Sequence, residues 1–251
     1  MIISVANQKG GVGKTTTVIN LSTYLAREGR RVLVIDADPQ ANATSGLGID
    51  KHKVAKSTYD LIINETPLKD TLINTDIDNL QIVPSHIDLV AADLELVSFI
   101  SRETRLREPL KDESNNFDFI FIDCPPSLSL LAINSMVAGD RILVPIQCEY
   151  YALEGVGQLL NTVKRIKKYL NPAIEIWRVL LTMYNHRTSL SRQVAEEVKS
   201  YFPGRVFSSI IPRSVRLSEA PSFGKPIAYY APESKGAIAY QQLAREVINL
   251  E

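Results

Sequence analysis

The sequence predicts an α/β fold with a doubly wound, mostly parallel sheet flanked by helices on both faces. Short, nearly continuous apolar runs recur along the 251 residues. Runs without polar alternation are typical of strands buried on both faces of a parallel sheet. Helical stretches lie between the runs, and this repetition favours the doubly wound arrangement. Strands are expected at residues 2–6, 32–35, 80–83, 119–122, 142–146, 179–181 and 206–211.

Helix-breaking residues define the expected helices. The first stops near Gly29, the second follows Ser127 as N-cap, and the third ends at Asn171-Pro172. The expected helices span residues 14–28, 128–137, 149–170, 190–201 and 234–250. Residues 50–78 are the least regular and are expected to form a surface excursion. Without a repeat, linker or low-complexity tract, residues 1–251 are predicted to form a single domain.

Composition narrows the class of protein. The chain is 45% hydrophobic and 22% charged, as in globular proteins that bury a core. It begins without a basic, apolar leader and has no run of about 18 apolar residues, so neither a signal peptide nor a membrane span is expected. Two cysteines are too few for a disulfide framework, which favours a cytoplasmic location. Cys124 and Cys148 belong to no closely spaced ligand set, which favours buried thiols over a metal cluster.

Charge is distributed unevenly along the chain. Residues 164–251 carry 14 Lys and Arg against 7 Asp and Glu, a balance of +7, and the first 163 residues carry −7. A basic half next to an acidic half indicates a surface that faces a polyanion. The alternative is that the basic residues only decorate solvated helix faces.

A glycine-rich loop, NQKGGVGKTTT at residues 7–17, follows the first predicted strand. It departs from the strict phosphate-loop pattern G-x-x-x-x-G-K-[ST], because Gln8 stands at the first glycine position and Lys9 adds a second cation. The remaining glycines are Gly10, Gly11 and Gly13. Glycines at these positions let backbone N–H groups approach an anion without interference from Cβ. A glycine turn that binds nothing is the alternative, which the backbone entropy of three glycines disfavours.

The helix that follows the loop carries two further phosphate-site residues. Its N-terminus directs a positive dipole end at the loop. Lys14 is placed to neutralise the β and γ phosphates, and the Thr15 hydroxyl is placed to bind Mg²⁺. The predicted ligand is therefore ATP with Mg²⁺.

Carboxylates follow two of the predicted strands. Asp36 and Asp38 follow the strand at 32–35, and Asp123 follows the strand at 119–122. Ligands of open α/β sheets bind at the carboxyl ends of the strands. Asp123 is predicted to hold Mg²⁺ directly or through water. Capping of the strand end is the alternative for Asp38 and Asp123.

The segment KGGVGKTT at residues 9–16 resembles the deviant Walker A motif of the ParA/MinD family of ATPases. The resemblance implies that the first glycine is dispensable and that the whole motif, Val12 and Thr16 included, binds nucleotide. It also implies that two subunits enclose two nucleotides and that Lys9 reaches the phosphates held by the partner. Such a cation acts on the transferred phosphoryl group as an arginine finger does. A Lys9 acting within its own subunit is the alternative.

Resemblance to the chromosomal ParA subgroup, also called Soj, extends over essentially the whole chain. It rests on DADPQANATSGLG (36–48), DCPPSL (123–128), PIQCEYYALEG (145–155), TMYNHRT (182–188) and IPRSVRLSEAPSFGKPI (211–227). It implies that Asp38 lies near the attacking water and the metal, and that Asp36 is structural. It also implies that Pro212 and Ser214 lie against adenine, although the family usually has asparagine where this chain has Ser214.

Two arginines match positions that contact DNA in this subgroup, Arg187 and Arg216. The resemblance implies non-specific binding of double-stranded DNA by the ATP-bound dimer, and phosphate contacts need no base readout. With Lys9 almost at the chain start, no N-terminal helix-turn-helix domain is expected. The alternative is that both arginines only pair with Glu219 or other acids.

The implied function is that of a partitioning ATPase that segregates or positions a chromosome or plasmid. ATP closes a homodimer on the nucleoid, and a ParB-type centromere-binding activator stimulates a weak basal hydrolysis and releases it. Three alternatives stand beside this function. They are a MinD-like membrane-associated ATPase, which the chain's C-terminal residues disfavour, a metabolic or metallocluster ATPase, and a ParA-like ATPase that positions a protein cargo.

Overall fold

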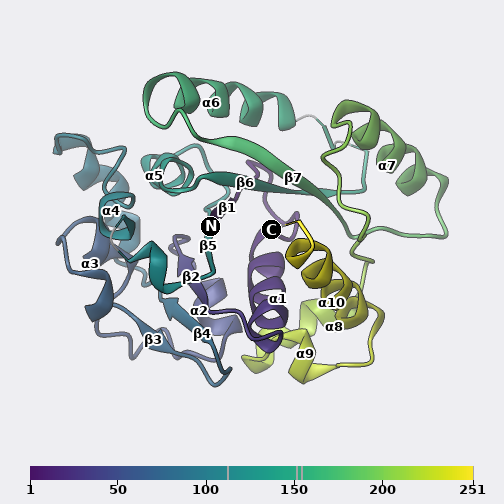
Figure 1. Cartoon of the computed structure of the whole chain (residues 1–251), viewed down its shortest axis with the longest axis horizontal. Coiled ribbons are helices and arrows are strands. Elements are labelled where there is room, and N and C mark those ends of the chain that lie inside the picture. Colours follow the sequence, from purple (N-terminus) through teal and green to yellow (C-terminus); the bar gives the residue numbers. More distant parts are fainter. Residues whose placement is uncertain (112, 151, 154, 251) are drawn as a thin grey trace.

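A seven-stranded sheet runs through the computed structural model, which describes residues 1–111, 113–150, 152, 153 and 155–250 (Figure 1). The strand order is β3-β4-β2-β5-β1-β6-β7. All neighbouring strands are parallel except β3 and β4, which pair antiparallel at one edge. The strands are β1 (Ile2–Val5), β2 (Val32–Asp36), β3 (Ile73–Asn74), β4 (Leu80–Val83), β5 (Phe119–Asp123), β6 (Arg141–Gln147) and β7 (Glu175–Thr182). The predicted fold class is confirmed.

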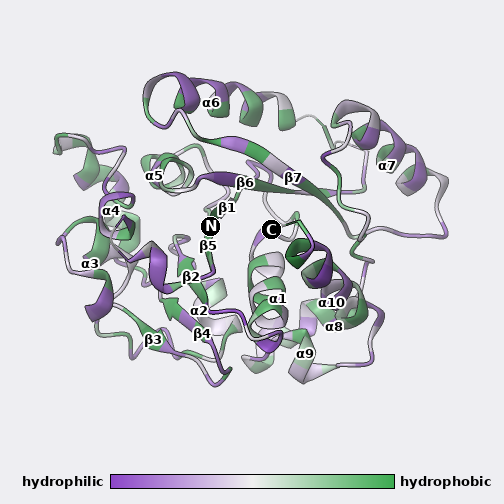
Figure 2. Cartoon of the chain, in the orientation of Figure 1, coloured by the Kyte–Doolittle hydropathy of each residue, from purple (hydrophilic) through white to green (hydrophobic). Residues whose placement is uncertain are grey.

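Two hydrophobic cores cover the two faces of the sheet. Leu33 and Ile35 of β2 belong to one core and Val32 and Val34 to the other, as the alternation of side chains along a strand requires. The first core includes residues of α3 (Thr58–Ile62), α4 (Leu89–Glu95), α5 (Leu130–Ala138), α6 (Val156–Tyr169) and α7 (Ser189–Tyr201). The second includes residues of α1 (Lys14–Arg27), α2 (Asn42–Gly46), α8 (Val215–Glu219), α9 (Ile227–Tyr230) and α10 (Lys235–Ile248). Apolar residues therefore line the inner sides of the helices (Figure 2).

The predicted strand at 206–211 is wrong. Val206 forms a single bridge with Val179, and the Phe207 and Ile211 N–H groups each donate to a β7 carbonyl at 2.9 Å. Between them, the N–H groups of Ser208 and Ser209 donate to the Glu246 carboxylate of α10 at 2.7 and 2.9 Å. A side chain of the neighbouring helix therefore takes the donors that a continuous ladder with β7 would need.

Two predicted helix starts are also wrong. Ser129 caps α5 instead of Ser127, because the Ser129 Oγ accepts a hydrogen bond from the Ala132 N–H at 3.4 Å. The helix predicted at 149–170 begins at Val156, and residues 150, 152, 153 and 155 form turns. Two positions of that predicted helix, 151 and 154, lie outside the described residues.

The segment at 50–78 contains more regular structure than predicted. Ser57 and Asp60 form a reciprocal capping box at the start of α3. The edge strand β3 also lies in this segment. None of the described helices is long and apolar enough to cross a membrane.

Candidate nucleotide-binding site

The glycine loop connects the end of β1 to the start of α1 and is held by hydrogen bonds to β6 and β7. The Thr182 hydroxyl of β7 donates to the Val12 carbonyl at 2.8 Å. The Asn7 amide donates to the Pro145 carbonyl of β6 at 2.7 Å and accepts from the Lys9 N–H at 3.0 Å. Two strands therefore fix the loop at the carboxyl edge of the sheet.

Backbone conformation explains two of the three loop glycines. Gly11 has φ +71° and Gly13 has φ +91°, the left-handed region that favours glycine. Gly13 is the N-cap of α1, so no side chain accepts a hydrogen bond from the first N–H groups of this helix. Gly10 and Gly11 are exposed. The loop thus offers exposed backbone next to the uncapped N-terminus of a 14-residue helix, an arrangement that binds anions.

Lys14 is buried within the loop. Its ammonium donates to the Lys9 carbonyl at 3.3 Å, the single hydrogen bond resolved for it in the described part of the chain. Burial lowers the pKa of Lys14, while the nearby Asp123 and Asp38 carboxylates raise it. An ammonium with one long hydrogen bond keeps donors for a phosphate oxygen.

Lys9, by contrast, is only half-buried. Its backbone takes part in the loop through Asn7 and Lys14. Its ammonium makes no hydrogen bond or ion pair with any residue that the structure describes. Among the described residues of its own subunit, the Lys9 ammonium therefore has no acceptor.

Asp123 ends β5 and is fully buried, yet neither carboxylate oxygen has a hydrogen-bond partner among the described residues. Burial raises the pKa of Asp123 well above its usual range, and the Asp36 carboxylate opposite it in the sheet register raises it further. The neighbouring Thr15 hydroxyl and the Lys14 ammonium oppose this rise. A buried, unpaired carboxylate beside a hydroxyl fits Mg²⁺, which takes one or two carboxylates together with phosphate oxygens.

Asp36 differs from Asp123 because its carboxylate is fully bonded. It accepts from the Thr44 N–H at 2.8 Å, from the Thr44 hydroxyl at 2.7 Å and from the Asp38 N–H at 3.2 Å. Burial raises the pKa of Asp36 to about 6, and the Thr44 and Asp38 hydrogen bonds oppose that rise. The Thr44 hydroxyl also accepts from the Ser85 N–H at 2.9 Å. These bonds tie the loop after β2 to the end of β4.

Asp38 lies in that loop with 8% of its surface exposed. One carboxylate oxygen accepts from the Gln40 N–H at 3.0 Å. The Asp38 carboxylate raises the pKa of both Lys14 and Asp123, so the structure places these three groups near one another.

A cavity of about 150 Å³ adjoins the loop. It is lined by Gly13, Thr16, Thr182, Met183, Ile211, Pro212, Arg213, Ser214, Leu217, Ser218 and Tyr240. The predicted base contacts Pro212 and Ser214 therefore lie on the same cavity as Thr16. Sequence reasoning missed Thr182 and Met183, whose signal was their position at the carboxyl end of a strand. Met183 has φ +52°, a backbone conformation that is uncommon for a residue other than glycine.

The two predicted DNA contacts lie at the surface, outside this cavity. Arg187 is exposed and, in the described chain, pairs with no carboxylate. Arg216 is 61% exposed at its side chain and pairs with Glu219 at 3.0 Å, and the Tyr230 hydroxyl donates to the same carboxylate at 3.1 Å. The pairing of Arg216 with Glu219, the alternative to DNA contact, is thus present, although most of the arginine side chain still faces solvent.

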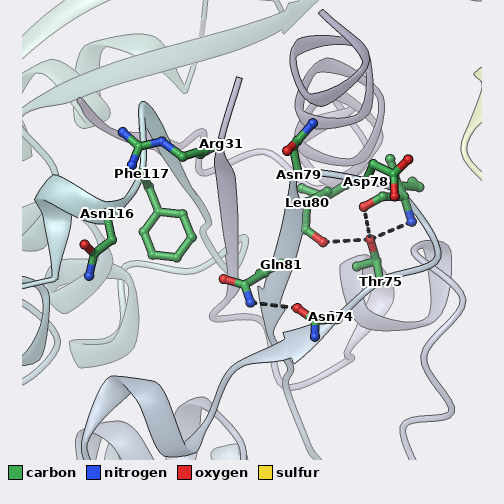
Figure 3. A pocket seen from close by; sticks show the side chains of 10 residues that line it. Arg31, Asn74, Thr75, Asp78, Asn79, Leu80, Gln81, Asn116 and Phe117 are labelled. Carbon is green, nitrogen blue, oxygen red and sulfur yellow. Dashed lines mark hydrogen bonds between the residues drawn. The ribbon is translucent and has the colours of Figure 1, made fainter. Parts of the chain in front are cut away.

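A larger hollow of about 370 Å³ lies at the opposite, amino edge of the sheet (Figure 3). Its polar groups are bonded to one another: the Thr75 hydroxyl donates to the Leu80 carbonyl at 2.8 Å, and the Gln81 amide donates to the Asn74 side chain at 2.7 Å. None of the loop residues or carboxylates described above lines it. The glycine loop and these carboxylates therefore lie at the other edge of the sheet from this hollow.

Comparison with known proteins agrees with this geometry. The AAA domain family matches residues 1–176. The sporulation initiation inhibitor protein Soj of Bacillus subtilis is 54% identical over 246 residues, covering 98% of this chain and 97% of that protein. The chromosome partitioning protein ParA of Myxococcus xanthus is 49% identical over 247 residues, covering 98% and 87%.

A solved structure extends the comparison to bound ligands. Cobyrinic acid a,c-diamide synthase from Mycobacterium smegmatis, crystallised with ADP and magnesium, superposes with a TM-score of 0.86 at 36% identity, covering 99% of this chain and 94% of that one. The same enzyme has also been solved with an ATP analogue and magnesium.

Proposed function

The chain belongs to the Soj/ParA family of chromosome-partitioning ATPases, and on that premise we propose that it works as an ATP-dependent dimer that binds DNA and releases it on hydrolysis. Its cofactors are ATP and Mg²⁺, as the ligands of the related structures indicate. The observation that carries the proposal is the contrast between the two lysines of the loop. Lys14 is buried beside Asp123, whereas the Lys9 ammonium has no partner within the described residues.

The residues at the loop would divide the work as follows. The N–H groups of the glycine loop and the Lys14 ammonium would hold the phosphates. Thr15 and Asp123 would hold Mg²⁺, with Asp38 close by. When bound, Mg²⁺ neutralises charge on the β and γ oxygens. Asp38 would orient the attacking water.

Lys9 would complete the site of the partner subunit. Its backbone is fixed by Asn7, and its ammonium keeps all three donors for an acceptor outside the subunit. A cation brought in by the partner stabilises charge on the phosphoryl group only after the dimer closes. Hydrolysis would therefore depend on dimerisation.

The ATP-bound dimer would bind double-stranded DNA of any sequence through Arg187 and Arg216. Both arginines are exposed, and the basic balance of residues 164–251 supports the same surface. A ParB-type protein on the cargo would stimulate hydrolysis, which would release the protein from the nucleoid. The nucleotide would then act as a switch between bound and free populations.

Light scattering of the Asp38→Ala variant tests this function. With Mg-ATP the variant should have the mass of a dimer and bind DNA, yet hydrolyse ATP very slowly. With ADP it should be a monomer, and Lys14→Ala should be a monomer with either nucleotide. Normal turnover by Asp38→Ala would remove the role given to that carboxylate, and a monomer in Mg-ATP would remove the dimer. Affinity capture with the ATP-locked variant would then show whether the cargo adaptor is a centromere-binding protein.

A further inference from the structure

Glu219 is a single acid within a cationic stretch of the chain. Residues 205–232 contain this one acid and four cations, Arg205, Arg213, Arg216 and Lys225. The Glu219 Oε2 atom accepts from the Arg216 guanidinium at 3.0 Å and from the Tyr230 hydroxyl at 3.1 Å. The acid therefore lies directly on Arg216, one of the two proposed DNA contacts.

Local helix stability does not explain this acid. Glu219 is the last residue of α8, where a negative charge faces the negative end of the helix dipole. The cation Arg216 stands three residues before the acid, which is the less favourable order for such a pair. The two side chains are 61% and 39% exposed, so their ion pair adds little to the stability of the fold.

Tyr230 of α9 holds the carboxylate in place. Its hydroxyl donates to Glu219, and its ring stacks on Phe223 with 5.0 Å between the ring centroids. α8, α9 and α10 pack together beside α1 (Figure 1). α8 lies very close to α10, because a Cβ at Gly236 would stand 2.8 Å from Leu217. The position of the acid is therefore set by packing on both sides.

The segment that carries Arg216 lies beside the loop that carries Arg187. The Tyr184 N–H donates to the Ile211 carbonyl at 3.0 Å, and the Arg213 N–H donates to the Tyr184 carbonyl at 3.0 Å. These hydrogen bonds join the two proposed DNA contacts in one surface.

A second acid pairs with this surface more loosely. Glu149 lies 3.6 Å from Arg213, which is beyond hydrogen-bonding distance. Arg187 pairs with no carboxylate of the described residues. Among these three arginines, Arg216 is thus the one whose guanidinium is hydrogen-bonded to an acid that the structure describes.

We infer that Glu219 competes with DNA phosphates for Arg216 and thereby limits the affinity of the protein for DNA. A phosphate must displace the carboxylate from the guanidinium or bind beside a negative charge that repels it. The ion pair is exposed, so this competition should reduce DNA affinity without abolishing it. The inference rests on the proposed contact between Arg216 and DNA, and it adds an acid that opposes this contact.

Fluorescence anisotropy with a labelled duplex of about 30 base pairs and arbitrary sequence tests the inference on the full chain in Mg-ATP. At low salt, Glu219→Gln should bind the duplex about two- to fivefold more tightly than the intact chain, and added salt should shrink this gain. Tyr230→Phe keeps the ring stack but releases the carboxylate, so it should give a smaller gain. The matched control is Glu108→Gln, which removes an acid from another exposed ion pair, with Lys111, and should leave DNA affinity unchanged.

A double-mutant cycle separates competition for Arg216 from the general effect of an acid near DNA. Arg216→Ala combined with Glu219→Gln should bind no more tightly than Arg216→Ala alone, because the carboxylate then has no contact to oppose. An equal gain from Glu219→Gln with and without Arg216 would overturn the inference, since the acid would then act on DNA directly.

The same cycle distinguishes failure of the inference from failure of the proposed function. If Arg216→Ala weakens DNA binding while Glu219→Gln leaves it unchanged, the DNA contact stands and the inference alone fails. If Arg216→Ala has no effect, the contact assigned to Arg216 fails and the inference with it. Both side chains are exposed, so each variant should keep the unfolding temperature of the intact chain within a few degrees.

Discussion

Replacing Asp123 by asparagine should make the nucleotide-free protein more stable while removing the stabilisation that Mg-ATP provides. The carboxylate is fully buried, has no hydrogen-bond partner among the described residues, and lies opposite Asp36 in the sheet. The amide keeps nearly the same volume and cannot ionise, so it removes the cost of burying the charged form and its repulsion by Asp36. Lys14 keeps Asp38 as a nearby counter-charge. The loss of charge should therefore outweigh the loss of attraction to Lys14.

Asparagine here is still a buried polar group, so the expected gain is only the difference between an unpaired carboxylate and an unpaired amide, about 1–3 kcal/mol because the charged group costs more. For a chain of this length each kcal/mol shifts the unfolding midpoint by about 2–4 °C. Asp123→Asn should thus raise the midpoint by roughly 2–12 °C in EDTA at neutral pH. Adding Mg-ATP should raise the midpoint of the wild type further and leave that of the variant almost unchanged.

Thermal unfolding followed by circular dichroism measures both effects. Asp118→Asn is the matched control, because Asp118 pairs with Arg31 at 2.8 Å at the opposite edge of the sheet. Its removal should cost at most about 1 kcal/mol and leave the Mg-ATP response intact. A midpoint for Asp123→Asn below that of the wild type in EDTA would refute the reasoning, since the Lys14–Asp123 attraction would then exceed the cost of burial.

Two further predictions concern surface charge and pH. In a salt titration, Arg216→Ala should weaken binding to duplexes of any sequence and reduce the slope of log affinity against log salt by about one. ATP affinity should stay unchanged. The control Lys53→Ala, in the acidic half of the chain, should change neither DNA affinity nor the slope, and a DNA affinity that does not depend on salt would contradict the assignment. Burial raises the pKa of Asp36 from 3.8 to about 6. Between these pH values the folded chain therefore binds more protons than the unfolded chain. The free energy of unfolding should fall by about 3 kcal/mol as pH rises through this window. Urea titrations of the nucleotide-free chain from pH 4 to about 7 would measure this fall in the free energy of unfolding. A free energy of unfolding that rises with pH over this range would exclude the effect of Asp36.

The central strands were predictable because their signal is local. Apolar runs such as 119–122 and 32–35 have no polar alternation. Such runs are typical of central strands that are covered on both faces of a parallel sheet. The run at 206–211 is also mostly apolar, apart from Ser208 and Ser209. It is not a strand, because Glu246, distant in sequence, accepts from the N–H groups of those two serines. Such competition for donors cannot be recognised from the run itself.

The candidate site was predictable to a similar degree. Glycine, lysine and carboxylate residues at strand ends identify the phosphate end of the site, because few other arrangements need that chemistry. Thr182 and Met183 line the adjoining cavity, yet neither residue type indicates a ligand by itself. The different states of Asp36 and Asp123 also required the structure, since only the fold places Thr44 against one carboxylate and leaves the other unpaired.

Mixing two inactive variants tests the dimer account most directly. Lys9→Ala keeps Asp38 but cannot supply the partner's cation, and Asp38→Ala supplies the cation but cannot orient water. In a mixed dimer, the nucleotide held by the Lys9→Ala subunit would have Asp38 from its own chain and Lys9 from its partner. If Lys9 acts across the dimer, steady-state phosphate release by the mixture should exceed that of either variant alone. Release no greater than the two variants measured separately would contradict a Lys9 that completes its neighbour's site.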